Sequence, residues 1–203
     1  TIITNNKAME QYLNCNVKRY VQKQLFSHIS KAKTILGLAG LHPEKYLEVL
    51  PEYKQCILVD FNPVNMLVRK NSLIGEFDLL TNRPAEHNPV NFVDCDFCRS
   101  IINNGIDLKY IYHKMKLSTV KNKYIAFTFC LRGVGEEKTM EWLACNFPEL
   151  NIPFNYTFIT DDRCKDVGYR KYVKRAYDGT KHLDIYRYRD SGDNMISGLI
   201  KIQ

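Results

Sequence analysis

The sequence has no long apolar segment. None of its hydrophobic runs approaches the roughly 18 consecutive residues that a membrane-spanning helix needs. Its first residues are polar and lack the apolar core of a secretory signal, and the start at Thr1 leaves open whether an upstream segment was removed. We therefore expect a protein that does not interact with membranes.

A disulfide framework and a zinc site are also missing. The seven cysteines are odd in number and scattered, and several lie in runs expected to form strands or helices. This pattern is typical of reduced thiols in a cytoplasmic protein. Cys95 and Cys98 form the single C-x-x-C pair, but no second pair and no histidine at ligand spacing accompanies them. We expect both cysteines to be structural and predict no metal site.

The apolar content is sufficient for one domain. The chain has 203 residues, of which 45% are hydrophobic and 25% charged, and this suits a single α/β domain over residues 1–203. No internal repeat, low-complexity tract or linker indicates a second domain. The formal net charge of +7 favours polyanionic partners such as nucleic acid. Abundant Asn, Lys, Ile and Tyr indicate an A/T-rich coding genome, as in a virus or a low-GC organism.

Two short apolar runs near the N-terminus are separated by small residues and a helix-like stretch. The second run, 56–59, stops at Asp60. The first run, 34–38, ends in a turn of small residues, Gly37, Ala39 and Gly40. In a Rossmann-like sheet this order builds a nucleotide pocket, because small residues let the ligand approach the backbone and the acid accepts hydrogen bonds from ribose hydroxyls.

The spacing differs from a dinucleotide-binding fingerprint. There is no G-x-G-x-x-G, and no glycine stands where its third one belongs. An ordinary βαβ unit without a ligand is therefore the alternative for this segment.

Hydrophobic periodicity predicts the remaining elements. An N-terminal helix within residues 1–30 has apolar residues at helical spacing, with the following polar residues facing away: Lys18, Arg19, Gln22 and Lys23. Residues 71–89 mix breakers and polar residues and are expected to form an irregular insertion. Further strands are expected at 90–93, 124–130 and 154–160, helices at 108–115, from 136 and at 167–177, and a final hairpin at 182–188 and 195–202. The predicted fold class is α/β, a Rossmann-like, doubly wound, mostly parallel sheet of about seven strands with a C-terminal antiparallel β-hairpin.

This order of elements, together with the turn and Asp60, resembles class I S-adenosylmethionine (SAM) methyltransferases. The resemblance covers nearly the whole chain and implies SAM as the cofactor. It implies that Asp60 holds the ribose and that the cofactor loop contains Gly37, Ala39 and Gly40. The family usually has an acid near the end of strand one and a second loop glycine, where this chain has Gly37 and Leu41.

The resemblance also implies a role for the acids that follow the third expected strand. In that position the family commonly has a polar or acidic residue that contacts the adenine amine, so Asp94 or Asp96 is expected to bind the cofactor. A solvated acidic turn that caps the next helix is the alternative.

The resemblance names no catalytic residue. Methyltransferases that modify base amines in nucleic acids carry an Asp/Asn-Pro-Pro-Tyr/Phe element after strand four, and this chain has FTFCLRGVG at the expected fourth strand. Adenine-N6 and cytosine-N4 chemistry is therefore disfavoured. Cys130 lacks the Pro-Cys context of cytosine-C5 enzymes, and we expect it to be a small core residue.

Cations gather in the C-terminal third of the chain. One face of the expected helix 167–177 carries Arg170, Lys171, Lys174 and Arg175, which suits a phosphate backbone. Arg132, in a glycine-flanked loop, is a candidate for binding phosphate or carboxylate. A solvated helix face and a surface arginine are the alternatives. We predict a SAM-dependent methyltransferase that acts on RNA or DNA; the alternative is a catalytically degenerate protein of the same fold that binds nucleic acid or protein.

Overall fold

The computed structural model describes most of the chain. The described residues are 16–29, 34–38, 55–59, 90–97, 99–163 and 171–203. Their helices are α2 (Asn16–Phe26), α5 (Ile101–Leu117), α6 (Glu136–Asn146) and the 3-10 turn η1 (Pro148–Leu150). Their strands are β1 (Thr34–Leu38), β2 (Gln55–Val59), β3 (Phe92–Asp96), β4 (Lys123–Cys130), β5 (Thr157–Thr160), β6 (Lys174–Tyr177), β7 (His182–Asp190) and β8 (Asp193–Ile202).

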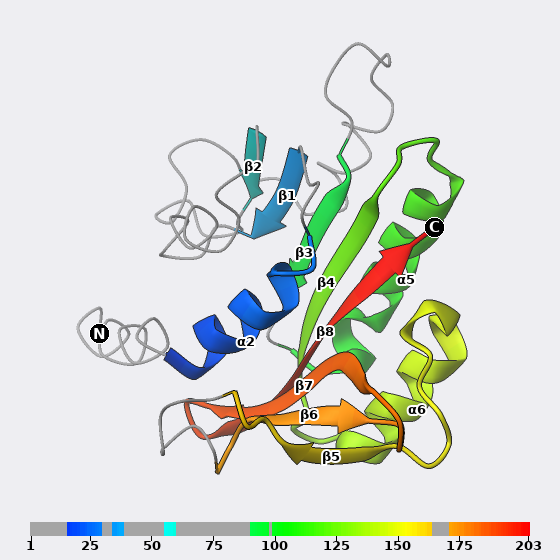
Figure 1. Cartoon of the computed structure of the whole chain (residues 1–203). Coiled ribbons are helices and arrows are strands. Elements are labelled where there is room, and N and C mark those ends of the chain that lie inside the picture. The colour runs from blue at the N-terminus through cyan, green and yellow to red at the C-terminus, as the bar shows by residue number, and fades with distance from the viewer. Residues whose placement is uncertain (1–15, 30–33, 39–54, 60–89, 98, 164–170) are drawn as a thin grey trace, which may run out of the picture.

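One sheet contains all of these strands, in the order β2-β1-β3-β4-β8-β7-β6-β5 (Figure 1). The four strands from β2 to β4 are parallel to one another. From β4 onward every pairing is antiparallel. The sheet therefore has a parallel half made early in the chain and an antiparallel half made late, joined where β4 meets β8.

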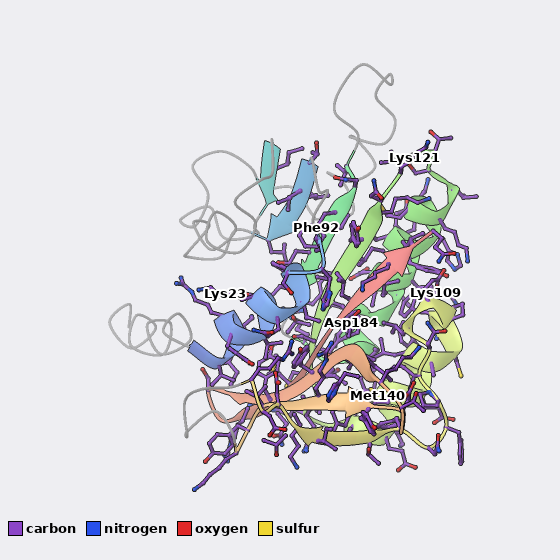
Figure 2. The ribbon with its side chains drawn as sticks, in the orientation of Figure 1. Lys23, Phe92, Lys109, Lys121, Met140 and Asp184 are labelled. Atoms are coloured by element: carbon purple, nitrogen blue, oxygen red, sulfur yellow. The ribbon has the colours of Figure 1, made fainter. Side chains whose placement is uncertain are left out.

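Helices cover both faces of the sheet, which makes it doubly wound (Figure 1). On one face, α5 and α6 pack through residues such as Leu108 and Met140 against Val93 and Phe127. On the other, Val21 and Leu25 of α2 are in the same cluster as Phe92. Phe92 and Val93 are neighbours in β3 and point to opposite faces because side chains alternate along a strand. Figure 2 labels one residue of each layer, Met140 and Phe92.

The predicted α/β fold class is confirmed, and most predicted strands lie within one to three residues of their observed bounds. The antiparallel part is larger than the predicted hairpin, because β5 and β6 extend it to four strands. The expected insertion at 71–89 lies outside the described residues, and a single domain over 1–203 stays a prediction. Among the described helices, none has the length and apolarity that a bilayer crossing requires.

The predicted helix at 167–177 is wrong over its described part. Residues 174–177 form strand β6, which pairs with β5 on one side and β7 on the other. Val173 and Ala176 are buried, a spacing of three that is also found in helices. Pairing with two neighbouring strands overrides this local pattern, since it satisfies the backbone of β6 on both edges.

The junction between the two halves depends on a close approach at Gly198. A β-carbon built there would lie 2.7 Å from Phe127 Cε1 and 3.1 Å from the carbonyl oxygen of Asp184. Gly198 is opposite Phe127 in the β4–β8 register, and the ring of Phe127 is fully buried. The ring therefore occupies the space that any other residue at this position would need.

We expect Gly198→Ala to lower the free energy of unfolding by about 1–3 kcal/mol, because the buried ring has to move. Urea denaturation measures this loss. In a Phe127→Leu background the same substitution should cost less than about 1 kcal/mol, since the ring that it displaces is absent. Equal costs in both backgrounds would contradict the assignment.

Candidate functional site

The parallel half of the sheet contains a topological switch point. From β1 the chain proceeds to β2 on one side and later returns to β3 on the other. In open α/β sheets ligands bind beyond the carboxyl ends of the strands at such a point, because the loops that follow the two strands leave in opposite directions. The candidate site is therefore the edge where β1 and β3 end.

The structure places part of the predicted cofactor site at this edge. Gly37 lies in β1 directly opposite Asp94 of β3, and Asp94 is buried. The strands β1 and β2 end in register, at Leu38 and Val59. The next residues in the sequence are those predicted to bind SAM: Ala39 and Gly40 after β1, and Asp60 after β2. These three lie outside the described residues, so their contact with a cofactor stays a prediction.

The acids of β3 differ in position from the prediction. The strand was expected to end at 93 with Asp94 following it, but it continues to Asp96. Asp94 is thus inside the strand, while Asp96 ends it at the switch point. Both side chains project to the face that α2 covers, since they alternate with Val93 and Cys95 of the opposite core.

A buried ion pair connects Asp96 to α2. Lys18 Nζ lies 2.8 Å from Asp96 Oδ1 and 2.8 Å from Oδ2. Only 11% of the lysine side chain and 7% of the aspartate side chain are exposed. The sequence analysis placed Lys18 and Gln22 on the outward face of the N-terminal helix, and this was wrong because both are buried. The hydrophobic periodicity of the sequence could not identify Lys18 as buried, because a lysine counts as polar although its aliphatic stem can pack in the protein interior.

Three hydroxyl groups lie beside Asp96 on the neighbouring strands β4, β8 and β7. Thr128 of β4 is opposite Asp96 on one side and opposite Ser197 of β8 on the other. The hydroxyl oxygens of Thr128 and Ser197 are 2.7 Å apart, and the phenol oxygen of Tyr188 is 2.9 Å from that of Ser197. All three hydroxyl residues are almost fully buried. The one sequence signal was a threonine inside the apolar run YIAFTFC.

A second buried carboxylate anchors α2 beyond the end of β5. Asp161 accepts hydrogen bonds from the hydroxyl of Tyr20 at 2.9 Å and from Nε of Arg163 at 3.0 Å. Arg163 also donates to the hydroxyl of Tyr186. Burial alone would raise the pKa of Asp161, but the hydrogen bonds from Arg163 and Tyr20 lower it below the ordinary value of 3.8. The carboxyl group is therefore ionised at neutral pH.

The predicted cationic face is not formed by the described residues. Lys174 and Arg175 are consecutive in strand β6 and point to opposite faces of the sheet. Arg175 is engaged with Asp184 at 3.2 Å and lies over the ring of Tyr186. Lys171 is exposed in a turn, and Arg170 lies outside the described residues. A phosphate-binding helix face at this place is therefore ruled out for residues 171–177.

Arg132 is paired within the protein. Its guanidinium donates to both carboxylate oxygens of Asp193, at 2.6 Å and 2.8 Å, although 77% of its side chain is exposed. Glu136, Arg187 and Gly192 lie with these two residues around a groove of about 310 Å³ at the carboxyl end of β4. The groove contains two arginines and two carboxylates, so the charges of its lining balance.

Cys95 and Cys130 are buried free thiols. Burial, followed by the charge of Asp94, raises the pKa of Cys95 well above its ordinary value. A protonated thiol of this kind is unreactive, as expected for a structural cysteine. Cys98 lies outside the described residues. Within the described part of the chain, no cluster of three or more His, Cys, Asp or Glu side chains is arranged to hold a metal ion.

Comparisons with known proteins gave similarity in fold only. No family model and no curated protein matches the sequence. The solved structure of the N-methyltransferase NodS from Bradyrhizobium japonicum WM9 is 6% identical, with 93% of this chain and 98% of that chain covered and a TM-score of 0.49. An rRNA methylase from Streptococcus thermophilus is 9% identical, with 91% and 96% covered and a TM-score of 0.40. Scores below 0.5 carry no functional conclusion for this chain.

We expect the Lys18–Asp96 pair to contribute to stability. Lys18→Met or Asp96→Asn alone should lower the free energy of unfolding by about 3 kcal/mol, because each leaves one buried partner without its counter-charge. The double variant should lose less than the sum of the two single variants. Chemical denaturation measures all three. Arg132→Gln, which breaks an exposed pair, is the matched control and should change the free energy of unfolding much less than either single variant.

The pH dependence of the free energy of unfolding should reflect the ionisation of Asp161. Its folded pKa is lower than its unfolded pKa, so ionisation of this group stabilises the fold above the unfolded value of 3.8 and stops doing so as the pH falls through the folded value. We therefore expect the stability difference between the wild type and Asp161→Asn to be full at neutral pH and to shrink below about pH 4. Urea titrations between neutral and acidic pH measure it. Tyr20→Phe should show a smaller difference over the same range, and a difference independent of pH would contradict the assignment.

Proposed function

We propose that this protein is a SAM-dependent methyltransferase that modifies nucleic acid. The observation that carries the proposal is the order of the strands. The switch point lies between β1 and β3, and the last strand of the chain, β8, is inserted antiparallel between β4 and β7. A parallel nucleotide-binding half completed by a C-terminal antiparallel hairpin is the arrangement that the sequence resemblance implies.

The described residues at the switch point fit a cofactor that approaches the backbone. Gly37 has no side chain to fill the space beside Asp94. In the sequence Ala39 and Gly40 follow the end of β1 and Asp60 follows the end of β2, so these are the residues that would hold the cofactor and its ribose. Bound SAM supplies an activated methyl group. The protein then has to orient the acceptor atom and exclude water, and it needs a base only when the acceptor has a proton to lose.

The sheet order also changes the argument about the acceptor. In the Rossmann order 3-2-1-4-5 the neighbour of strand one on the side away from strand two is the fourth strand. β3 occupies this position, whereas the sequence analysis had assigned it to β4. The motif for base amines should therefore be sought at the end of β3, where the chain reads Asp94-Cys95-Asp96-Phe97.

This segment shares two of the four motif positions. An acid is at the first position and an aromatic residue at the fourth, while Cys95 and Asp96 replace the two prolines. Phe97 lies partly buried, with its ring centroid 6.0 Å from that of Phe129. A carboxylate near the end of a strand can accept a hydrogen bond from an exocyclic amine and so orient it toward the methyl donor, and Asp94 lies two residues before the end of β3. We therefore propose a base amine as the acceptor.

Titration with S-adenosylhomocysteine by calorimetry tests the proposed cofactor. We expect a dissociation constant in the micromolar range that rises at least about tenfold in Asp60→Ala, because hydrogen bonds to a charged acceptor are lost. Glu137→Ala, which removes an exposed acid from α6, is the matched control and should leave binding unchanged. Absence of binding at millimolar ligand would contradict the proposal.

Methyl transfer from labelled SAM to single-stranded DNA and RNA then tests the acceptor. Nucleoside digestion should place the label on an adenine or cytosine amine. Asp94→Asn keeps an acceptor oxygen and should retain activity, whereas Asp94→Ala should lower kcat by about 100-fold or more. Label on ribose or on protein would overturn the base-amine assignment and leave the cofactor result intact.

A further inference from the structure

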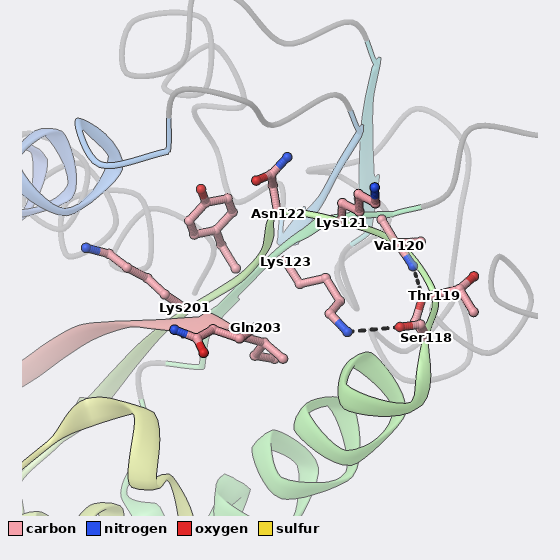
Figure 3. A pocket seen from close by; sticks show the side chains of 10 residues that line it. Ser118, Thr119, Val120, Lys121, Asn122, Lys123, Lys201 and Gln203 are labelled. Carbon is pink, nitrogen blue, oxygen red and sulfur yellow. Dashed lines mark hydrogen bonds between the residues drawn. The ribbon is translucent and has the colours of Figure 1, made fainter.

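A second groove lies at the opposite end of the sheet, beyond the amino end of β4. It has a volume of about 480 Å³ and is formed by the α5–β4 loop and the last residues of β8 (Figure 3). Its lining consists of Ser118, Thr119, Val120, Lys121, Asn122, Lys123, Tyr124, Lys201, Ile202 and Gln203. Lys121 marks this end of the molecule, far from Met140 of α6, in Figure 2.

Electrostatics favour an anion in this groove. Three of the lining residues are lysines, and among the described residues that line it none is acidic. Lys114 and Lys116 at the end of α5 add positive charge nearby. Lys116 is balanced by Glu149 and Lys201 by Asp184, whose carboxylate oxygen lies 2.8 Å from Lys201 Nζ. The groove therefore has an excess of positive charge.

Lys123 is built into the wall of the groove. Its ammonium donates to the carbonyl oxygen of Ser118 at 2.9 Å (Figure 3). It also donates to the carbonyl oxygen of Lys116, at the C-terminal end of α5, at 3.4 Å. Burial, with the charge of Lys116, lowers the pKa of Lys123. Helix carbonyl oxygens carry only partial negative charge and therefore do not fully neutralise the ammonium of Lys123. An anion bound in the groove would neutralise the remaining charge.

The groove also contains a ring beside a cation. Tyr124 is directly opposite Lys201 in the β4–β8 register, so the two side chains lie next to each other on one face of the sheet. Tyr124 is partly exposed and Lys201 is exposed. Lysines that neutralise phosphates next to an aromatic ring on which a base stacks are the features by which proteins hold single-stranded nucleic acid.

We propose that this groove binds the phosphate backbone of a single-stranded nucleic acid, with Lys121 and Lys201 contacting phosphates and Tyr124 stacking on a base. The proposal rests on the proposed function in that the substrate is nucleic acid. The groove is concave and has three lysines among its lining residues, which suits a strand better than a flat lipid surface.

The groove and the cofactor edge are separate. The end of β3 at Asp96 is opposite Thr128, five residues along β4 from Lys123 in the groove, so the two places are roughly 16 Å apart at about 3.3 Å per residue. Substitutions in the groove should therefore leave cofactor binding unchanged. This separation allows the two proposals to be tested independently.

Fluorescence anisotropy with a labelled 20-nucleotide single-stranded oligonucleotide tests the groove. At 0.1 M salt we expect Lys121→Gln/Lys201→Gln to lose at least about tenfold in affinity, and the slope of log K against log salt to fall by about 1.4, because two phosphate contacts are removed. Tyr124→Leu keeps apolar bulk and should lose about fivefold through stacking. Lys23→Gln/Lys138→Gln removes the same charge from two exposed lysines on α2 and α6 and should change affinity less than about threefold.

Equal losses in the groove variant and the charge-matched control, or no loss in either, would overturn the groove proposal. Thermal unfolding verifies that both variants are folded. The Lys121→Gln single variant keeps the Lys201–Asp184 pair, and its salt slope should change by about half as much as that of the double variant. S-adenosylhomocysteine binding separates the two proposals. Groove-dependent oligonucleotide binding without cofactor binding contradicts the proposed function alone. Groove-dependent binding to phosphatidylserine vesicles, with no binding to the oligonucleotide, would assign the groove to a membrane surface instead.

Discussion

The pairing of β4 with β8 is the constraint on which the rest of this structure depends. It runs from Lys123 opposite Ile202 to Cys130 opposite Met195, and it is the place where the parallel half of the sheet meets the antiparallel half. Because β8 is the last strand of the chain, the sheet joins residues that are far apart in sequence. Closing such long loops costs entropy before the contacts form, so the close approach of Gly198 to Phe127 has to be stabilised by the buried layers on both faces.

Polar pairs fix α2 against this sheet in addition to apolar contacts. Lys18 contacts Asp96 at the end of β3, and Tyr20 contacts Asp161 beyond β5. His28, two residues after the end of α2, lies 3.3 Å from Asp184 in β7. Burial is the main cause of a lowered pKa for His28, so its interaction with Asp184 is weaker at neutral pH than a full ion pair. Each of these pairs needs its own partner, so together they specify one position of the helix where apolar packing alone would tolerate several. Through Lys18, α2 is thereby held at the carboxyl end of β3.

The two ends of the parallel strands carry opposite chemistry. The carboxyl edge has Asp94, Asp96 and the hydroxyl row that begins at Thr128, which suits hydrogen bonding to a cofactor or a base. The amino edge has the lysines of the α5–β4 loop and β8, which would attract a phosphate backbone. In the proposed complex the substrate would be held by its backbone at the amino edge and by a base at the carboxyl edge.

The local sequence pattern was sufficient to predict those elements whose apolar residues by themselves indicate which faces are buried. The run YIAFTFC is apolar on both faces, which predicts a central strand, and the apolar runs at 34–38 and 56–59 predict the strands of the parallel half. The residues from 174 to 177 form a strand because β5 and β7 lie on either side of them, and their own pattern also fits a helix. Lys18 is buried because Asp96 is near it in space, 78 residues away in sequence. Only the sheet order placed β3 beside β1, and this order is the reason that the proposed contact to a base amine lies at β3 and not at β4. Pairing partners and buried counter-charges come from distant parts of the chain, so they were decided by the tertiary structure.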